Sequence, residues 1–398
     1  MIIGTDSIIH NPIHRSGPGR FIPMKSAERF SWWFFVLIML LFGALLHFSL
    51  SELNPDWFSY QVIYESDGAW LSERGRDPAF LVLIAMFANF FGSDGYEAFR
   101  IFFAFYFLLF LALLSSGCIF KLNLTKNGCV FLMIALVFLG CTRFTIQIRE
   151  GLAITLIVFS MALIHKRSCV PEQFHLRKSK RRLGEWLCIA GEFSLLILAA
   201  LIHAGTLPVL PIYLGALWAA GQGETERAQA WRLRLLWVFT FSIAGLSIGQ
   251  LHLGGAMERI ATETAGDRLM EAKALSVQQL GLWVLYGAAC WLVFRAIRSS
   301  VKQQQIIGTF ASFMQILAGP VITAAYVSIL LALMLGISPL FVATYVRWLH
   351  LFLALALLGL AVTDRCTWLM KLVGVFLIVD QLRSILDAIS IYSGVSLL

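Results

Sequence analysis

Two arginines that could bind phosphate lie between hydrophobic segments of the chain. Arg143 and Arg149 belong to the segment CTRFTIQIREGLA, which lies between two expected membrane spans. An arginine at the edge of a bilayer costs free energy unless it is paired or solvated, and its guanidinium can hold two phosphate oxygens at once. On a helix, Arg143, Gln147 and Glu150 share a face, while Arg149 points elsewhere. The alternative to a phosphate site is an anchoring ion pair between one of these arginines and Glu150.

Further candidates lie at or near the ends of other hydrophobic segments. Arg100 opens one segment, Arg347 lies about two turns inside another, and His203 ends a third. An arginine within a membrane segment must face protein or water, so Arg347 indicates a polar interior. A lone histidine at the end of a span is more often an interfacial or packed residue, but an imidazole can also deprotonate a hydroxyl group.

The loop 51–78 combines acidic and aromatic side chains. Asp56, Tyr60 and Tyr64 are spaced at i, i+4 and i+8, which predicts one helical face. Asp77, near the end of this loop, adds a carboxylate that could accept a proton. The alternative is a solvated connecting loop without a binding function.

The composition is that of a membrane protein. Of 398 residues, 59% are hydrophobic and only 14% charged, which is too little charge to cover a soluble domain of this size. The net charge of +8 comes from basic clusters between apolar segments, so we expect cytoplasmic loops and no nucleic-acid partner. The seven cysteines show no CxxC and no paired spacing, so neither a disulfide framework nor a metal site is expected. We expect no cofactor.

The hydrophobic segments predict an all-α, polytopic fold with about eleven transmembrane helices. A spanning helix needs about 20 mostly apolar residues. The expected spans are 32–50, 99–119, 128–142, 146–165, 185–203, 205–220, 233–250, 280–297, 310–334, 339–362 and 367–388. The span 310–334 could be interrupted near Gly319-Pro320. Residues 1–398 are expected to form a single integral membrane domain.

The lysine and arginine clusters predict the orientation of these spans. They place the N-terminal arm and the loops 121–127 and 166–184 in the cytoplasm. Residues 51–98, residues 251–279 and the C-terminus are then periplasmic, and 251–279 is expected to be an amphipathic helix on the membrane surface. This scheme requires that the apolar segment 79–91 does not cross the membrane. With thirteen residues, it is expected to be re-entrant or interfacial.

Five short motifs resemble the EpsG/Wzy-type polysaccharide polymerases. In chain order they are PDWFSY (55–60), DPAF (77–80), QIREGLA (147–153), LIHAG (201–205) and YVRW (345–348). The chain departs from the family pattern at Asp77 in place of glutamate, Ala79 in place of glycine and Glu150 in place of glutamine. Asp77 keeps the carboxylate but is one methylene shorter, and Glu150 adds a negative charge beside Arg149.

The resemblance implies an enzyme of the bacterial inner membrane whose active site faces the periplasm. Such enzymes join undecaprenyl-diphosphate-linked oligosaccharide units into a surface or secreted polysaccharide. The growing glycan leaves its lipid diphosphate and is transferred to the non-reducing end of a new lipid-linked unit. The expected partners are this lipid-linked oligosaccharide, membrane lipids and a regulator of chain length.

This function gives each candidate residue an expected role. Arginines would hold the negative charge of the lipid diphosphate in a metal-independent reaction, and a carboxylate or imidazole would deprotonate the acceptor hydroxyl. We expect Asp77, His203 and Arg149 to be catalytic. As the base, Asp77 and His203 rank about equally, with a slight preference for Asp77. The residues expected to bind substrate are Arg143, Arg347, Arg100, Asp56, Tyr60, Tyr64 and Gln147.

Other membrane functions would use a similar set of residues. A glycan ligase or acyltransferase would share the arginines and the histidine but use another acceptor. A flippase or exporter of the same glycolipid would need charge along an inward-opening cavity rather than only at the outer rim. A structural membrane subunit would need none of these groups.

Overall fold

The structure is a computed structural model of the 398-residue chain. It describes residues 61–62, 64–65, 77–92, 95–115, 119, 132, 134–135, 147–168, 178–220, 231–238, 240, 277–303, 306–334, 339–361, 368, 371–380 and 383. Within these ranges the regular structure is helical and contains no strand. This confirms the predicted all-α class.

Five helical stretches among the described residues are long and apolar enough to cross a membrane. They are Gly95–Leu114, Ile148–Ser168, Gly184–Ile202, Leu280–Lys302 and Gly308–Leu331. They belong to α5 (Gly95–Ser115), α7 (Ile148–Ser168), α8 (Lys178–Ile202), α12 (Val277–Lys302) and the continuous run of α13 (Gly308–Ile316), η5 (Leu317–Val321) and α14 (Ile322–Met334). These helices support the predicted membrane protein.

Of the other predicted spans, one is divided in the structure, one is almost wholly helical, and the rest are not fully described. The segment 205–220 forms η3 (Ala204–Thr206) and α9 (Val209–Ala219), and α15 covers Pro339–Ala361. Several predicted elements lie wholly or partly outside the described residues. They are the spans 32–50, 128–142, 233–250 and 367–388, and most of the surface helix 251–279.

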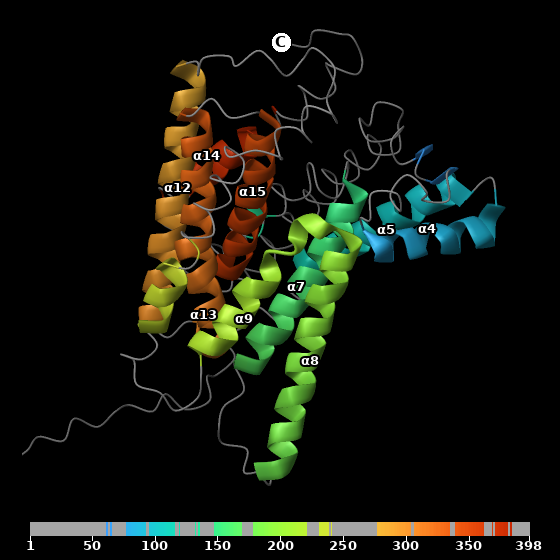
Figure 1. Cartoon of the computed structure of the whole chain (residues 1–398), viewed down its shortest axis with the longest axis horizontal. Helices are drawn as coiled ribbons and strands as arrows, with labels where there is room; N and C mark the ends of the chain where they lie inside the picture. The colour runs from blue at the N-terminus through green and yellow to red at the C-terminus, as the bar shows by residue number, and fades with distance from the viewer. Residues whose placement is uncertain are drawn as a thin grey trace, which may run out of the picture.

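The helix α4 (Pro78–Phe91) contains the segment for which we expected no membrane crossing. Its 14 residues rise about 21 Å, which is less than the roughly 30 Å of a bilayer core. Figure 1 shows α4 and α5 side by side, directed across the other long helices at the end of the bundle where α7 begins and α8 ends. We call this end of the bundle the site end.

The predicted loop 166–184 is shorter than expected because helices extend into it from both sides. α7 continues through Ser168, and α8 begins at Lys178. Basic residues are favourable at the C-terminal end of a helix, where His165, Lys166 and Arg167 form the last turn of α7.

A buried carboxylate connects the C-terminal end of α7, which lies away from the site end, to the neighbouring helices. Glu192 of α8 is fully buried and accepts hydrogen bonds from Arg167 Nε and Nη2 at 2.8 and 2.9 Å. Tyr213 of α9 donates to the same carboxylate at 2.6 Å, and Arg167 Nη1 donates to Thr309 of α13 at 3.3 Å. We call Arg167, Glu192, Tyr213 and Thr309 the Glu192 cluster. It connects three helices that follow one another in the chain, α7, α8 and α9, with α13, which lies much later in the sequence.

The predicted interruption near Gly319-Pro320 is a π-helical turn rather than a break. Residues Leu317–Val321 form η5, and the helix continues on both sides. Proline lacks the N–H group that an α-helix would use at this position, and a π-turn accommodates this loss. A side chain on Gly319 would come within 3.1 Å of Trp237 and 3.3 Å of Phe294, so the glycine permits close packing.

The helix α15 lies in the core of the bundle. The side chains of residues 351–358 are all buried, which is typical of a helix that is covered on every face. α15 packs against α12 and α14 (Figure 1). It therefore provides a rigid support for the residues at its beginning.

Candidate functional site

Asp77 connects three segments at the site end. It is the N-cap residue of α4, and its backbone has φ 54° and ψ 51°, the left-handed region that residues other than glycine rarely occupy. Its side chain does not cap α4. It instead accepts a hydrogen bond from Arg149 Nη1 at 2.6 Å and one from the Ala204 N–H at 2.8 Å. The carboxylate is only 4% exposed.

Arg149 lies in the first turn of α7 and carries the charge opposite to that of Asp77. A cation is unfavourable at the positive end of a helix dipole, and the Asp77 carboxylate offsets this cost. The guanidinium carbon lies 5.8 Å from the centre of the Phe80 ring, so an aromatic face of α4 supports it as well. The Arg149 side chain is 23% exposed, which leaves part of it accessible.

His203 follows the last residue of α8, where the chain changes direction. Its backbone is extended, with φ −148° and ψ 106°, and its carbonyl oxygen accepts a hydrogen bond from Thr206 Oγ1 at 2.8 Å. The ring nitrogen Nδ1 lies 4.0 Å from Asp77 Oδ2, beyond direct hydrogen-bond distance but within electrostatic range. The imidazole is 22% exposed.

The electrostatic environment keeps Asp77 ionised. Burial alone would raise the pKa of this carboxyl group. The His203 imidazole, the Ala204 N–H and the Arg149 guanidinium together outweigh that effect and lower the pKa below its ordinary value. A carboxylate with a lowered pKa is a weaker base, so this environment makes Asp77 less suited to accept a proton.

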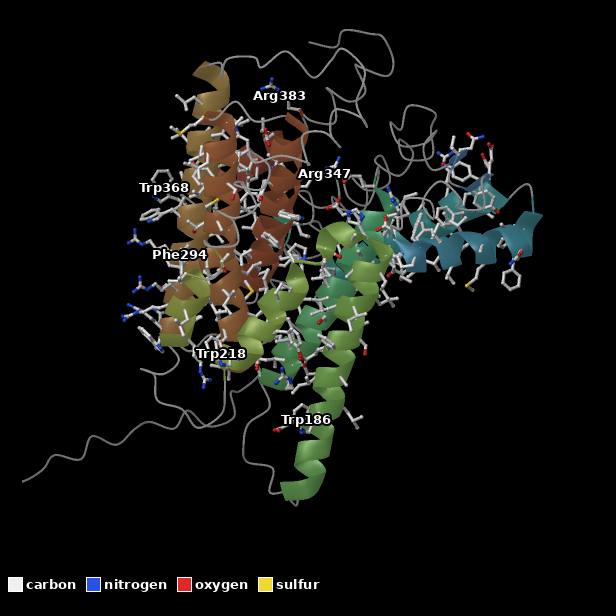
Figure 2. The ribbon with its side chains drawn as sticks, viewed as in Figure 1. Trp186, Trp218, Phe294, Arg347, Trp368 and Arg383 are labelled. Carbon is white, nitrogen blue, oxygen red and sulfur yellow. The ribbon has the colours of Figure 1, made fainter. Side chains whose placement is uncertain are left out.

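The first half of α15 reaches the same place. Trp348 donates a hydrogen bond from Nε1 to the carbonyl oxygen of Gly205 at 2.9 Å. Its neighbour Arg347 is exposed, and Figure 2 shows it on α15 at the site end. Four of the five motifs singled out in the sequence therefore contribute residues to one end of the bundle: DPAF, QIREGLA, LIHAG and YVRW.

Two of the expected substrate-binding residues are buried in the protein. The Tyr64 side chain is 6% exposed, and its ring packs against the rings of Tyr96 and Phe99. Its hydroxyl donates to the Gly92 carbonyl oxygen at 3.3 Å. Contrary to expectation, Tyr64 offers no accessible aromatic face for a sugar. Arg100 is also buried, with its guanidinium carbon 5.7 Å from the centre of the Tyr96 ring.

The remaining predicted site residues are only partly described. Gln147 directly precedes α7, and its carbonyl oxygen accepts the Gly151 N–H at 2.8 Å. The predicted residues Arg143, Asp56 and Tyr60 lie outside the described residues.

Three further residues of the site were not predicted from the sequence. Phe80, Gly205 and Trp348 each lie within a quoted motif, but the sequence reasoning assigned no role to them. The signal that could have identified them is that each lies within three positions of Asp77, His203 or Arg347 in the sequence.

The part of the chain that the structure describes contains no group of three histidine, cysteine or acidic side chains that could hold a metal ion. Comparison of the chain with family models, with curated proteins and with solved structures finds no match. The site combines a partly exposed guanidinium, an ionised buried carboxylate and a partly exposed imidazole.

Proposed function

We propose that this chain is a polymerase of lipid-linked oligosaccharides, which joins repeat units carried on undecaprenyl diphosphate at the periplasmic face of the inner membrane. One observation carries the proposal: Asp77, Arg149 and His203 lie in motifs far apart in the chain, yet they meet at one end of a bundle of apolar helices. The same residues carry the resemblance to EpsG/Wzy-type polymerases.

In this proposal His203 is the general base. A hydroxyl group of the acceptor sugar gives its proton to the imidazole, and its oxygen forms a bond to the anomeric carbon of the donor glycan. The bond between that carbon and the diphosphate oxygen breaks, and the lipid diphosphate leaves with the electron pair. The Asp77 carboxylate, 4.0 Å from Nδ1, stabilises the imidazolium that forms.

The arginines bind the leaving diphosphate. The negative charge on the leaving oxygen grows during the reaction, and a fixed guanidinium stabilises it more in the transition state than in the substrate. Arg149 is held in place by Asp77, so little reorganisation is needed when the diphosphate leaves. Arg347, exposed at the same end of the bundle, is the second cation that we assign to the diphosphate.

Deletion of the gene in the native cell tests the proposed reaction. We expect single lipid-linked repeat units to accumulate on the outer leaflet while long polymer disappears. Accumulation of the units on the inner leaflet would instead identify a flippase. Normal polymer that is no longer attached to its final acceptor would identify a ligase. Either of these results would overturn the proposal.

A further inference from the structure

The turn that follows His203 is fixed from two sides. The Ala204 N–H donates to Asp77 Oδ1 at 2.8 Å, and the next residue, Gly205, accepts the indole N–H of Trp348 at 2.9 Å. Asp77 lies at the start of α4, and Trp348 lies on the core helix α15. Backbone groups of two successive residues, the Ala204 N–H and the Gly205 carbonyl, are therefore held by side chains from two different parts of the chain.

Gly205 leaves the space that the His203 ring occupies. A Cβ atom on Gly205 would lie 2.7 Å from His203 Nε2 and 3.1 Å from Cδ2. Real side chains do not approach this closely, so a side chain at this position would force the imidazole to move. With Nδ1 on the side of Asp77 and Nε2 over Gly205, both ring nitrogens have a defined environment.

We propose that Gly205 and Trp348 are positioning residues that hold the His203 imidazole in one orientation. Trp348 fixes the backbone of the turn, and the missing side chain of Gly205 admits the ring. The consequence for catalysis rests on the proposed function, but the orientation of the ring does not. Neither residue has to touch the substrate.

Two substitutions with matched controls test the proposal. Gly205→Ala adds the interfering methyl group, and Trp348→Phe removes the indole N–H but keeps an aromatic ring. The controls are Gly191→Ala, where an added Cβ atom meets nothing within 4 Å, and Trp186→Phe, where the tryptophan is 68% exposed on α8. We expect Trp348→Phe to lower the polymerisation rate about fivefold, the effect of one lost hydrogen bond. Gly205→Ala, which displaces the imidazole, should lower the rate at least as much. The controls should keep the wild-type rate.

A double-mutant cycle separates positioning from a general effect on the fold. In a His203→Gln background the imidazole is absent, so Gly205→Ala and Trp348→Phe should lower the residual rate no further. Multiplicative losses in that background would show that the two residues act independently of His203. This result would overturn the proposal.

A readout without turnover separates this inference from the proposed function. Diethyl pyrocarbonate modifies neutral imidazole nitrogens, and mass spectrometry of the peptide that contains His203 follows the reaction in the purified protein. We expect Gly205→Ala and Trp348→Phe to change the modification rate of His203 severalfold, while both controls match the wild type. If modification changes but the wild-type protein polymerises nothing, positioning stands and the proposed function fails. Unchanged modification in both test variants would overturn the positioning role, whatever the activity.

Discussion

At the scale of single residues, Asp77 determines how the site is assembled. Its left-handed backbone turns the carboxylate away from α4 and toward Arg149 and Ala204. Strained backbone of this kind persists where surrounding contacts hold it, and it is concentrated at functional sites. Asp77, Arg149 and His203 could be recognised in the sequence as candidate site residues because charged or titratable groups near apolar segments are unusual. It could not show that they meet, because their contacts depend on this backbone conformation and on how α7 and α8 pack.

The substitution Arg149→Lys should fail to restore the activity lost in Arg149→Ala. Lysine keeps the positive charge but lacks the planar fork that can hold the Asp77 carboxylate and a phosphate oxygen together. Polymer length in cells, measured on gels at matched protein levels, decides between the two variants. Full activity with lysine would show that Arg149 acts only through its positive charge. Full activity with alanine would show that Arg149 does not belong to the site.

The pH dependence of the rate should identify the base. A general base must be unprotonated to accept a proton, so the account predicts that the wild-type rate falls on the acid side of the pH profile. The pKa of Asp77 is lowered, so this carboxylate stays ionised down to a more acidic pH than an ordinary aspartate. The stability that it contributes is lost only when the pH falls through its lowered pKa.

The variants Asp77→Asn and His203→Gln should therefore give different pH profiles. Asp77→Asn should lower the rate but keep the decline on the acid side, whereas His203→Gln should remove the decline along with most of the activity. Purified enzyme in lipid vesicles, assayed over a pH series, provides the measurement. An acid decline that persists in His203→Gln and vanishes in Asp77→Asn would make Asp77 the base.

At the scale of elements, the bundle is connected by polar contacts that hydrophobic periodicity does not reveal. The Glu192 cluster joins α7, α8, α9 and α13, although Arg167 looked like one of several basic loop residues in the sequence. The irregularity near Gly319-Pro320 was predictable because proline and glycine change the backbone of the segment in which they lie. The partner of a buried carboxylate such as Glu192 depends on tertiary packing, which explains why it was not predicted.

The substitution Arg167→Met should destabilise the protein by about 3–5 kcal/mol, because it leaves the buried Glu192 carboxylate without its cation. The double variant Arg167→Met/Glu192→Leu should recover part of this loss. The neighbouring Lys166 is exposed, so Lys166→Met is a matched control that should change little. Thermal unfolding in detergent measures all three. Equal stability of Arg167→Met and the control would show that the ion pair contributes nothing.

At the scale of the whole molecule, the bundle has two chemically different ends. The site end carries Asp77, Arg149, His203 and Arg347, whereas Trp186 and Trp218 lie toward the opposite end (Figure 2). Composition and the length of the hydrophobic segments were sufficient to predict an all-α membrane protein, because both can be read without knowing how the helices pack. The crosswise direction of α4 and α5 in Figure 1 was not predictable, because apolar length alone does not fix the direction of a helix.

Reporter fusions test the proposed orientation of these ends. Fusions at Trp70 and His175 should report opposite sides of the membrane, with Trp70 periplasmic and His175 cytoplasmic. α8 begins just after His175 and ends next to His203, so one crossing by α8 would carry the chain from the cytoplasm to the site. Signals from the same side at both positions would contradict the orientation and the non-crossing placement of residues 79–91.

The most direct test of the central claim is polymerisation by the purified protein in lipid vesicles with one defined undecaprenyl-diphosphate-linked repeat unit. The wild-type protein should produce a ladder of polymer and release one lipid diphosphate for each new linkage. His203→Gln and Arg149→Ala should each slow this reaction by about 100-fold or more, the typical effect of losing a general base or a charge-stabilising group. No ladder from the wild-type protein, or an undiminished ladder from both variants, would contradict the account.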